Sequence, residues 1–171
     1  MFEVEVKAKS SGAVEANVRK LGKFIRKEAQ TDHYFQHPCK DFRKTDEALR
    51  VRAVDDAFRL TYKGPKSKGS LKVRREIEFP IDERIFGLLE SLGFFETLLV
   101  KKKREYYSVD GLEVSLDDVS GLGRYIEIES LDVKDEERIL SLAEKLGIGM
   151  ESFTTKTYSE LLEEANNPRG P

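Results

Sequence analysis

Charged and apolar residues alternate along much of this chain, beginning with its opening stretch, MFEVEVKAK. There Glu3, Glu5 and Lys7 share one parity, and apolar residues occupy the positions between them. Successive side chains of a strand point to opposite faces, so this alternation predicts a β-strand with one charged and one apolar face. The same test predicts strands over eight stretches: 2–9, 24–35, 48–54, 57–63, 70–79, 97–109, 112–118 and 124–130.

Helical spacing of apolar residues appears elsewhere and predicts amphipathic helices. Three such stretches end in Leu-Gly, at Gly22, Gly93 and Gly147, where glycine can take the left-handed conformation that terminates a helix. A fourth, shorter helix is predicted before the last six residues. The predicted helices span 11–21, 82–92, 135–146 and about 157–165.

Length and composition limit what this protein can be. We expect one domain over 1–165, because 171 residues suffice for one substantial core, and a disordered tail over 166–171, NNPRGP. Charged residues are 36% of the chain but nearly cancel, at a net charge of −2, so no nucleic-acid partner is expected. A single cysteine, Cys39, and no apolar run of membrane-spanning length predict a cytoplasmic protein with no membrane association.

The charged faces of the predicted strands carry both signs and few neutral polar residues. Glu-x-Glu occurs at 3–5, 76–78 and 127–129, and each pair places two carboxylates about 7 Å apart on one strand face. Arg50 and Arg52 share a face in the same way. In the run 101–105 both faces carry charge, so the sequence leaves open which parity belongs with the other charged faces.

One charged face ordinarily meets water, but a whole set of them favours a different arrangement. About eight strands can close into a barrel, with amphipathic helices covering its apolar exterior and the charged faces lining its interior. Arginine and lysine on several strands could then surround a polyphosphate. The clustered carboxylates would repel it unless a hard divalent cation, Mg²⁺ or Mn²⁺, lay between them. The two signs together therefore indicate a metal with a triphosphate.

No glycine-rich phosphate loop accompanies these charges. The segment 64–69, GPKSKG, lacks the spacing of a Walker motif and is interpreted as a hairpin connection.

The chain resembles the CYTH superfamily, the triphosphate tunnel metalloenzymes, which include class IV adenylyl cyclases and thiamine or inorganic triphosphatases. A lone ExExK motif is weak evidence, but here the matching segments follow the family's order over nearly the whole chain. They are EVEVK at 3–7, QTDHYF at 30–35, ALRVR at 48–52, LTYKGP at 60–65, REIE at 75–78, KKR at 102–104 and LDDVSGLGRYIEIE at 116–129.

The resemblance implies an α+β fold, an eight-stranded antiparallel tunnel with inward charged faces, and a role for each matching position. Lys7 and Tyr34 match a pair thought to orient or activate water in the triphosphatases, although Tyr34 could equally be a packed aromatic. Glu76 and Glu78 are further acidic tunnel candidates. The implied metal ligands are Glu3, Glu5, Asp117, Glu127 and Glu129, and the implied triphosphate ligands are Lys7, Arg50, Arg52, Lys63, Lys102 and Arg104.

The resemblance is strongest to class IV adenylyl cyclases, which implies conversion of ATP to cyclic AMP and pyrophosphate with Mg²⁺ or Mn²⁺. The alternative is a phosphohydrolase of tripolyphosphate, thiamine triphosphate or nucleoside triphosphates. Against it, Gln36-His37-Pro38 stands where the triphosphatases often carry Asp-Thr-Pro. A third reading is a non-catalytic polyphosphate- or nucleotide-binding module, which the retained carboxylates disfavour. A homodimer is a possible assembly, since the cyclase branch is commonly dimeric.

Overall fold

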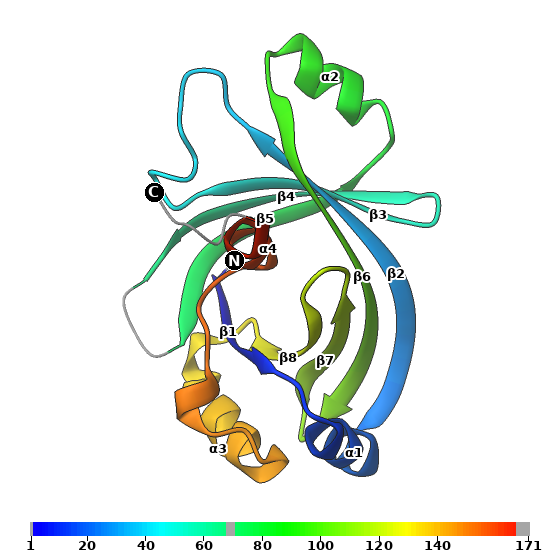
Figure 1. Cartoon of the computed structure of the whole chain (residues 1–171), viewed down its shortest axis with the longest axis vertical. Helices are drawn as coiled ribbons and strands as arrows, with labels where there is room; N and C mark the ends of the chain where they lie inside the picture. The colour runs from blue at the N-terminus through cyan, green and yellow to red at the C-terminus, as the bar shows by residue number, and fades with distance from the viewer. Residues whose placement is uncertain (1, 68–70, 167–171) are drawn as a thin grey trace.

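The computed structural model describes residues 2–67 and 71–166 (Figure 1). Its strands are β1 Phe2–Lys9, β2 Lys23–Gln36, β3 Ala48–Val54, β4 Ala57–Lys66, β5 Lys72–Ile81, β6 Phe95–Val109, β7 Leu112–Val119 and β8 Gly123–Ser130. Its helices are α1 Gly12–Leu21, α2 Ile85–Ser91, α3 Glu136–Leu146 and α4 Tyr158–Asn166, with short 3₁₀ turns η1 Val133–Asp135 and η2 Met150–Ser152. Of the predicted tail, Asn166 ends α4, and 167–171 lie outside the described residues.

The eight strands form one closed barrel in the order β1-β5-β4-β3-β2-β6-β7-β8, and every neighbouring pair is antiparallel. Closure comes from β1, which pairs with β5 on one side and β8 on the other. The ladder register sets charged residues of opposite sign beside each other, as at Lys7 with Glu127 and Lys63 with Glu76. The predicted eight-stranded antiparallel barrel is confirmed.

The apolar faces of the strands point outward and pack under the helices. The largest cluster joins Val4 and Val6 of β1 to Val18 of α1 and Ile139 of α3, all of them buried. Two smaller clusters lie beneath α2 and α4. In Figure 1, α2 lies at one end of the barrel and α1 and α3 lie at the other. The first cluster and the cluster beneath α2 therefore lie outside the barrel wall. The cluster beneath α4 lies on the inward side of the wall, because Val100 and Tyr125 share the strand parities of Lys102 and Glu127, and Tyr158 itself lines the interior.

Two of the three glycines predicted to terminate helices adopt the left-handed conformation, with φ of 83° at Gly93 and 87° at Gly147. The prediction is wrong for Gly22, which is extended at φ −96°. Glycine is required there by crowding: a Cβ atom would lie 2.8 Å from the Val18 carbonyl oxygen and 2.9 Å from Val109 Cγ2. The helix predicted at 82–92 is shorter, Ile85–Ser91.

Gly22→Ala should lower the free energy of unfolding by about 1–3 kcal/mol, because the added methyl group has no space between α1 and β6. Gly12→Ala is the matched control at the other end of α1, where a Cβ meets nothing within 4 Å. That control should be neutral or slightly stabilising, since alanine favours the helix. Urea unfolding of both variants measures the difference, and equal stabilities would refute the crowding at Gly22.

Candidate active site

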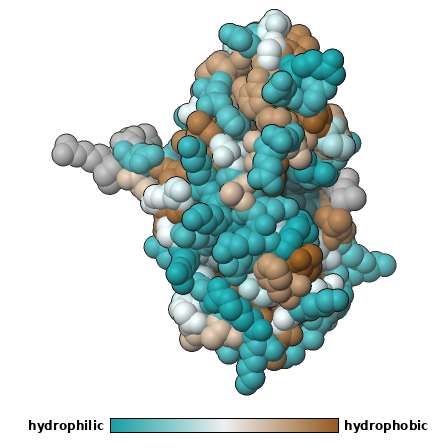
Figure 2. Space-filling view, turned by 90° about the vertical axis from the view of Figure 1, so that its right-hand side faces the viewer, coloured by the Kyte–Doolittle hydropathy of each residue, from teal (hydrophilic) through white to brown (hydrophobic). Residues whose placement is uncertain are grey.

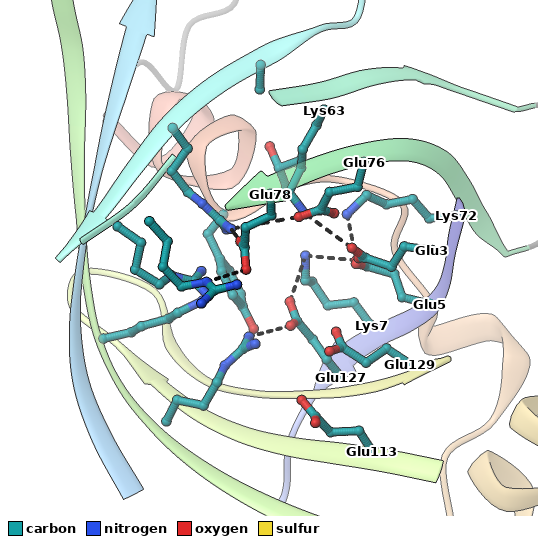
Figure 3. Close-up of a pocket in the computed structure, with 18 of the residues that line it drawn as sticks. Glu3, Glu5, Lys7, Lys63, Lys72, Glu76, Glu78, Glu113, Glu127 and Glu129 are labelled. Atoms are coloured by element: carbon teal, nitrogen blue, oxygen red, sulfur yellow. Dashed lines mark hydrogen bonds and ion pairs between the residues drawn. The ribbon is translucent and has the colours of Figure 1, made fainter. Parts of the chain in front are cut away.

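The barrel encloses a cavity of about 580 Å³, called the tunnel below. Among the described residues that line it, nine are cationic and seven are acidic. They come from all eight strands, and Figure 3 shows several of them converging on one space. On the face seen in Figure 2, hydrophilic side chains gather over the middle of the molecule. The charged lining is Glu3, Glu5, Lys7, Arg26, Arg50, Arg52, Arg59, Lys63, Lys72, Glu76, Glu78, Lys102, Arg104, Glu113, Glu127 and Glu129.

Three of the predicted metal ligands, Glu3, Glu5 and Glu129, form a compact group, called the carboxylate group below. One oxygen from each lies within 4.8 Å of the others (Figure 3). The ladders between β1 and β8 explain this, because Glu5 stands directly opposite Glu129. The Glu129 side chain makes neither a hydrogen bond nor an ion pair with any residue in the described part of the chain. Burial and the neighbouring Glu3 carboxylate raise the pKa of Glu129 well above its usual range.

The chemistry of this group fits a hard divalent cation. Carboxylate oxygens are the preferred ligands of Mg²⁺ and Mn²⁺, and crowded carboxylates repel one another until a proton or a cation neutralises them. Lys72 already neutralises part of the charge, since its Nζ lies 2.6 Å from Glu5 Oε1. Glu3, Glu5 and Glu129 are thus the residues that would hold a metal ion.

The structure does not bring the other two predicted metal ligands into the carboxylate group. Glu127 lies between Lys7, at 3.1 Å, and Arg104, and these cations keep its pKa well below the usual range despite burial. Asp117 is buried and accepts two hydrogen bonds from Arg104, at 2.7 and 2.5 Å, and one from Tyr158, at 2.7 Å. Both carboxylates therefore hold cationic side chains in place.

Lys7 lies between the two kinds of charge. Its Nζ lies 3.5 Å from Glu5 and 3.1 Å from Glu127. Burial alone would lower the pKa of Lys7, but the flanking carboxylates outweigh burial and raise that pKa above its usual range. Lys7 is therefore a fixed cation, able to donate hydrogen bonds but unable to accept a proton near neutral pH. Tyr34, its predicted companion, also lines the tunnel.

Beyond Lys7 lies a set of four predicted triphosphate ligands, Arg50, Arg52, Lys102 and Arg104, called the cationic group below. Arg52 is half-buried and the other three are buried, and all four line the tunnel. The structure thus settles the parity of the basic run on β6, because Lys102 and Arg104 face inward. Burial and the neighbouring Arg104 lower the pKa of Lys102 to about 7, which reflects the concentration of positive charge here.

The remaining predicted residues lie along β4 and β5. Lys63 binds Glu76 at 2.6 Å and Glu3 at 3.5 Å, which connects it to the carboxylate group. Glu78 accepts hydrogen bonds from Arg50 at 3.2 Å and from Thr61 at 2.7 Å. Neither Glu76 nor Glu78 belongs to the carboxylate group. Burial raises the pKa of each, but a hydrogen bond, with Glu3 for Glu76 and with Thr61 for Glu78, and the nearby cations hold both pKa values at about 2.

Lys72, Asp32 and Tyr158 are among the residues of the site that sequence reasoning missed. Lys72 shares the inward parity of Glu76 and could have been found by applying that parity to the whole predicted strand. Asp32 shares the parity of Tyr34 on β2, and its carboxylate binds Arg52 at 2.6 and 2.9 Å. Tyr158 lines the tunnel from α4, and no strand parity could have indicated that contact.

The sequence of the chain was also compared with models of known protein families. The CYTH domain model matches residues 1–158. The chain belongs to the CYTH domain family. None of the helices in the described part of this CYTH protein combines the length and the apolar composition that a membrane crossing requires.

Individual CYTH relatives resemble the chain over nearly its whole length. "Putative adenylate cyclase MJ0240" of Methanocaldococcus jannaschii is 40% identical over 172 residues, which cover 94% of this chain and 98% of that protein. The solved structure of PH1819 from Pyrococcus horikoshii is 43% identical, with a TM-score of 0.87, and the match covers 95% of this chain and 98% of that one. HpAC1 from Hippeastrum, whose structure is described as revealing a dominant triphosphatase activity, shares the fold at 18% identity and a TM-score of 0.71, covering 95% of each chain.

Asp32→Asn should destabilise the CYTH barrel by about 3–5 kcal/mol at neutral pH, because it leaves buried cations without their counter-ion. The surrounding cations Arg52, Arg50 and Lys102 depress the pKa of Asp32 although burial opposes them. A depressed pKa stabilises the fold above the unfolded value of about 4, and this contribution is lost as the pH falls.

The stability difference between parent and Asp32→Asn should therefore narrow as the pH falls below about 4. Urea unfolding at a series of pH values from 7 to 3 measures this difference. Asp56→Asn, at an exposed position of the β3–β4 turn, is the control and should be neutral throughout. A pH-independent difference for Asp32→Asn would contradict the ionic role of Asp32.

Proposed function

We propose that this CYTH protein is a divalent-metal-dependent enzyme that converts ATP to cyclic AMP and pyrophosphate. The observation that carries the proposal is the division of one cavity into a carboxylate group, Glu3, Glu5 and Glu129, and a cationic group on the opposite side of Lys7. The cationic group suits phosphate oxygens, because arginine offers paired donors and lysine a point charge. The carboxylate group suits the metal that a triphosphate carries.

Charge balance supports the need for the metal. A triphosphate carries roughly four negative charges near neutral pH, about two of them on its terminal phosphoryl group. The lining cations already face seven acidic side chains, and Asp32 and Asp117, buried inside the barrel, neutralise further positive charge. A bare triphosphate would thus bring in more negative charge than the tunnel can neutralise. When bound, a divalent cation would neutralise charge on the phosphate oxygens.

The protein's own side chains would bind and orient the substrate. Arg50, Arg52 and Arg104 are each held by a carboxylate, so their guanidinium groups are placed before a ligand arrives. Lys7, permanently charged between Glu5 and Glu127, would donate to a phosphate oxygen at the boundary with the metal. In a cyclase the ribose 3′-oxygen attacks the α-phosphorus and pyrophosphate leaves, which requires in-line placement of the ribose.

The cyclase assignment is supported by the 40% identical relative that bears a cyclase name. A triphosphate phosphohydrolase is the second candidate. It is favoured by the Hippeastrum protein, which is named as an adenylyl cyclase and yet has a dominant triphosphatase activity. The two reactions use the same charged lining and differ in which oxygen attacks which phosphorus atom.

Product analysis separates the candidates. The protein is incubated with ATP, GTP, thiamine triphosphate or tripolyphosphate, with Mg²⁺, Mn²⁺ or chelator, and the products are separated by chromatography. We expect cyclic AMP and pyrophosphate from ATP, with no product in chelator. Orthophosphate would instead support the hydrolase, and binding without turnover would leave only a triphosphate-binding module.

Glu129→Gln tests the carboxylate group. The substitution keeps the side-chain volume but removes a charged ligand, so metal-dependent turnover should fall by at least about a hundredfold. Without metal, the melting temperature should stay the same or rise, because the neutral amide removes the cost of burying a carboxylate beside Glu3. Asp118→Asn, on the outward face of β7, is the control and should retain turnover. Near-normal metal-dependent turnover in Glu129→Gln would show that the metal is held elsewhere.

A further inference from the structure

The segment that follows α3 forms part of the tunnel wall beside Lys7. Its backbone pairs with β1 through a bridge between Phe153 and Ala8, and the Thr154 N–H donates to the Lys7 carbonyl oxygen at 2.8 Å. The Lys7 side chain points back to the same segment, since its Nζ donates to the Lys156 carbonyl oxygen at 3.2 Å. Both ends of Lys7 are therefore fixed by residues about 150 positions away in the chain.

A helix-capping motif positions Tyr158, the aromatic residue that follows this segment. Thr157 and Glu160 form a capping box: the Glu160 N–H donates to Thr157 Oγ1 at 3.2 Å, and the Thr157 N–H donates to Glu160 Oε2 at 2.6 Å. This box starts α4 at Tyr158, and it fixes that residue as the first of the helix. Tyr158 is buried and lines the tunnel.

The Tyr158 ring faces two ammonium groups. Lys7 Nζ lies 4.3 Å and Lys102 Nζ lies 4.9 Å from the ring centroid, although the two lysines come from β1 and β6. The Tyr158 hydroxyl donates to Asp117 Oδ2 at 2.7 Å, and the same carboxylate binds Arg104. One side chain thus contacts two cations directly and a third through its counter-ion.

Simple packing does not require these contacts. The ring also packs edge-on against Tyr125, with centroids 5.4 Å apart, and belongs to an apolar cluster with Leu162. A leucine could fill that space. Only an aromatic ring presents a negative face to ammonium groups, and burial strengthens this attraction. Burial, with the nearby Glu127 and Asp117, also raises the pKa of Tyr158 well above its usual range, so the phenol stays neutral.

We propose that Tyr158 is a positioning residue, whose ring holds the Lys7 and Lys102 ammonium groups in the arrangement that receives the substrate's phosphate oxygens. This role rests on the proposed function, because it supposes that both lysines bind a triphosphate. Without the ring, the two flexible lysine side chains would repel each other and would have to be ordered by the ligand. Part of the binding free energy would then be lost to that ordering.

Tripolyphosphate binding measures the role directly. Titration calorimetry with tripolyphosphate and Mg²⁺ is performed on the parent, Tyr158→Leu, Tyr158→Phe and Leu162→Ala, well below each melting temperature. Tyr158→Leu should weaken binding about tenfold, because it removes two buried cation–ring contacts. Tyr158→Phe keeps the ring and should bind within about threefold of the parent. Leu162→Ala removes a buried apolar contact of the same helix, and it should lower the melting temperature but leave affinity nearly unchanged.

The variants separate the effects of the Tyr158 ring, the Tyr158 hydroxyl and the docking of α4. Parent-like affinity in Tyr158→Leu would overturn the positioning role while leaving the proposed function intact. Equal losses in Tyr158→Leu and Leu162→Ala would show that docking of α4, and not the ring, matters. An equal loss in Tyr158→Phe would assign the effect to the hydroxyl, and this variant remains informative if Tyr158→Leu does not fold. A parent that binds no tripolyphosphate would refute the binding of a triphosphate by the two lysines, and with it the role of Tyr158.

Discussion

The structure depends on the neutralisation of charges inside a closed barrel. A buried charge without a partner is strongly destabilising, so each inward side chain needs an opposite charge within reach. The ladder register supplies many of these partners from the adjacent strand: Lys7 faces Glu127, Lys63 faces Glu76, and Arg104 faces Asp117. A shift of one residue in the pairing register of a strand would turn its charged side chains toward the apolar exterior and its apolar side chains toward the tunnel. The register that closes the barrel is thus the same one that assembles the site.

These ion pairs are better understood as a means of holding the site than as a source of stability. Removing ions from water costs about as much as their attraction returns, so buried pairs contribute little net free energy. The fold is stabilised instead by the apolar clusters outside the wall, such as the one joining Val4, Val18 and Ile139. This separation allows the interior to keep a crowded Glu129 and a Lys102 whose pKa lies near 7. Both are unfavourable in the empty protein, and a bound metal and phosphate would offset that cost.

Much of this could be predicted from sequence, because a strand's faces are fixed by parity. In the opening strand Glu3, Glu5 and Lys7 face the tunnel, and Glu3 and Glu5 lie in the carboxylate group. Parity could not predict which face points inward where both faces carry charge, as on β6 around Lys102. It also cannot say which carboxylate approaches which cation, and so the separation of Asp117 from Glu129 was not foreseen. Gly22 and Tyr158 depend on contacts between distant segments, which no local pattern contains.

The charge of Lys7 bears on what this site can offer a ligand. In the empty protein Glu127 and Glu5 outweigh burial and raise the pKa of Lys7, so Lys7 is charged there and offers charge and hydrogen bonding to a ligand. The charged lining then stabilises either reaction alike, and the outcome depends on which oxygen is held in line. The uncharged lining residues would contribute to that placement. Tyr34, Ile77, Tyr106 and Leu131 surround the same cavity, and the part of the substrate that is not phosphate would lie against side chains of this kind.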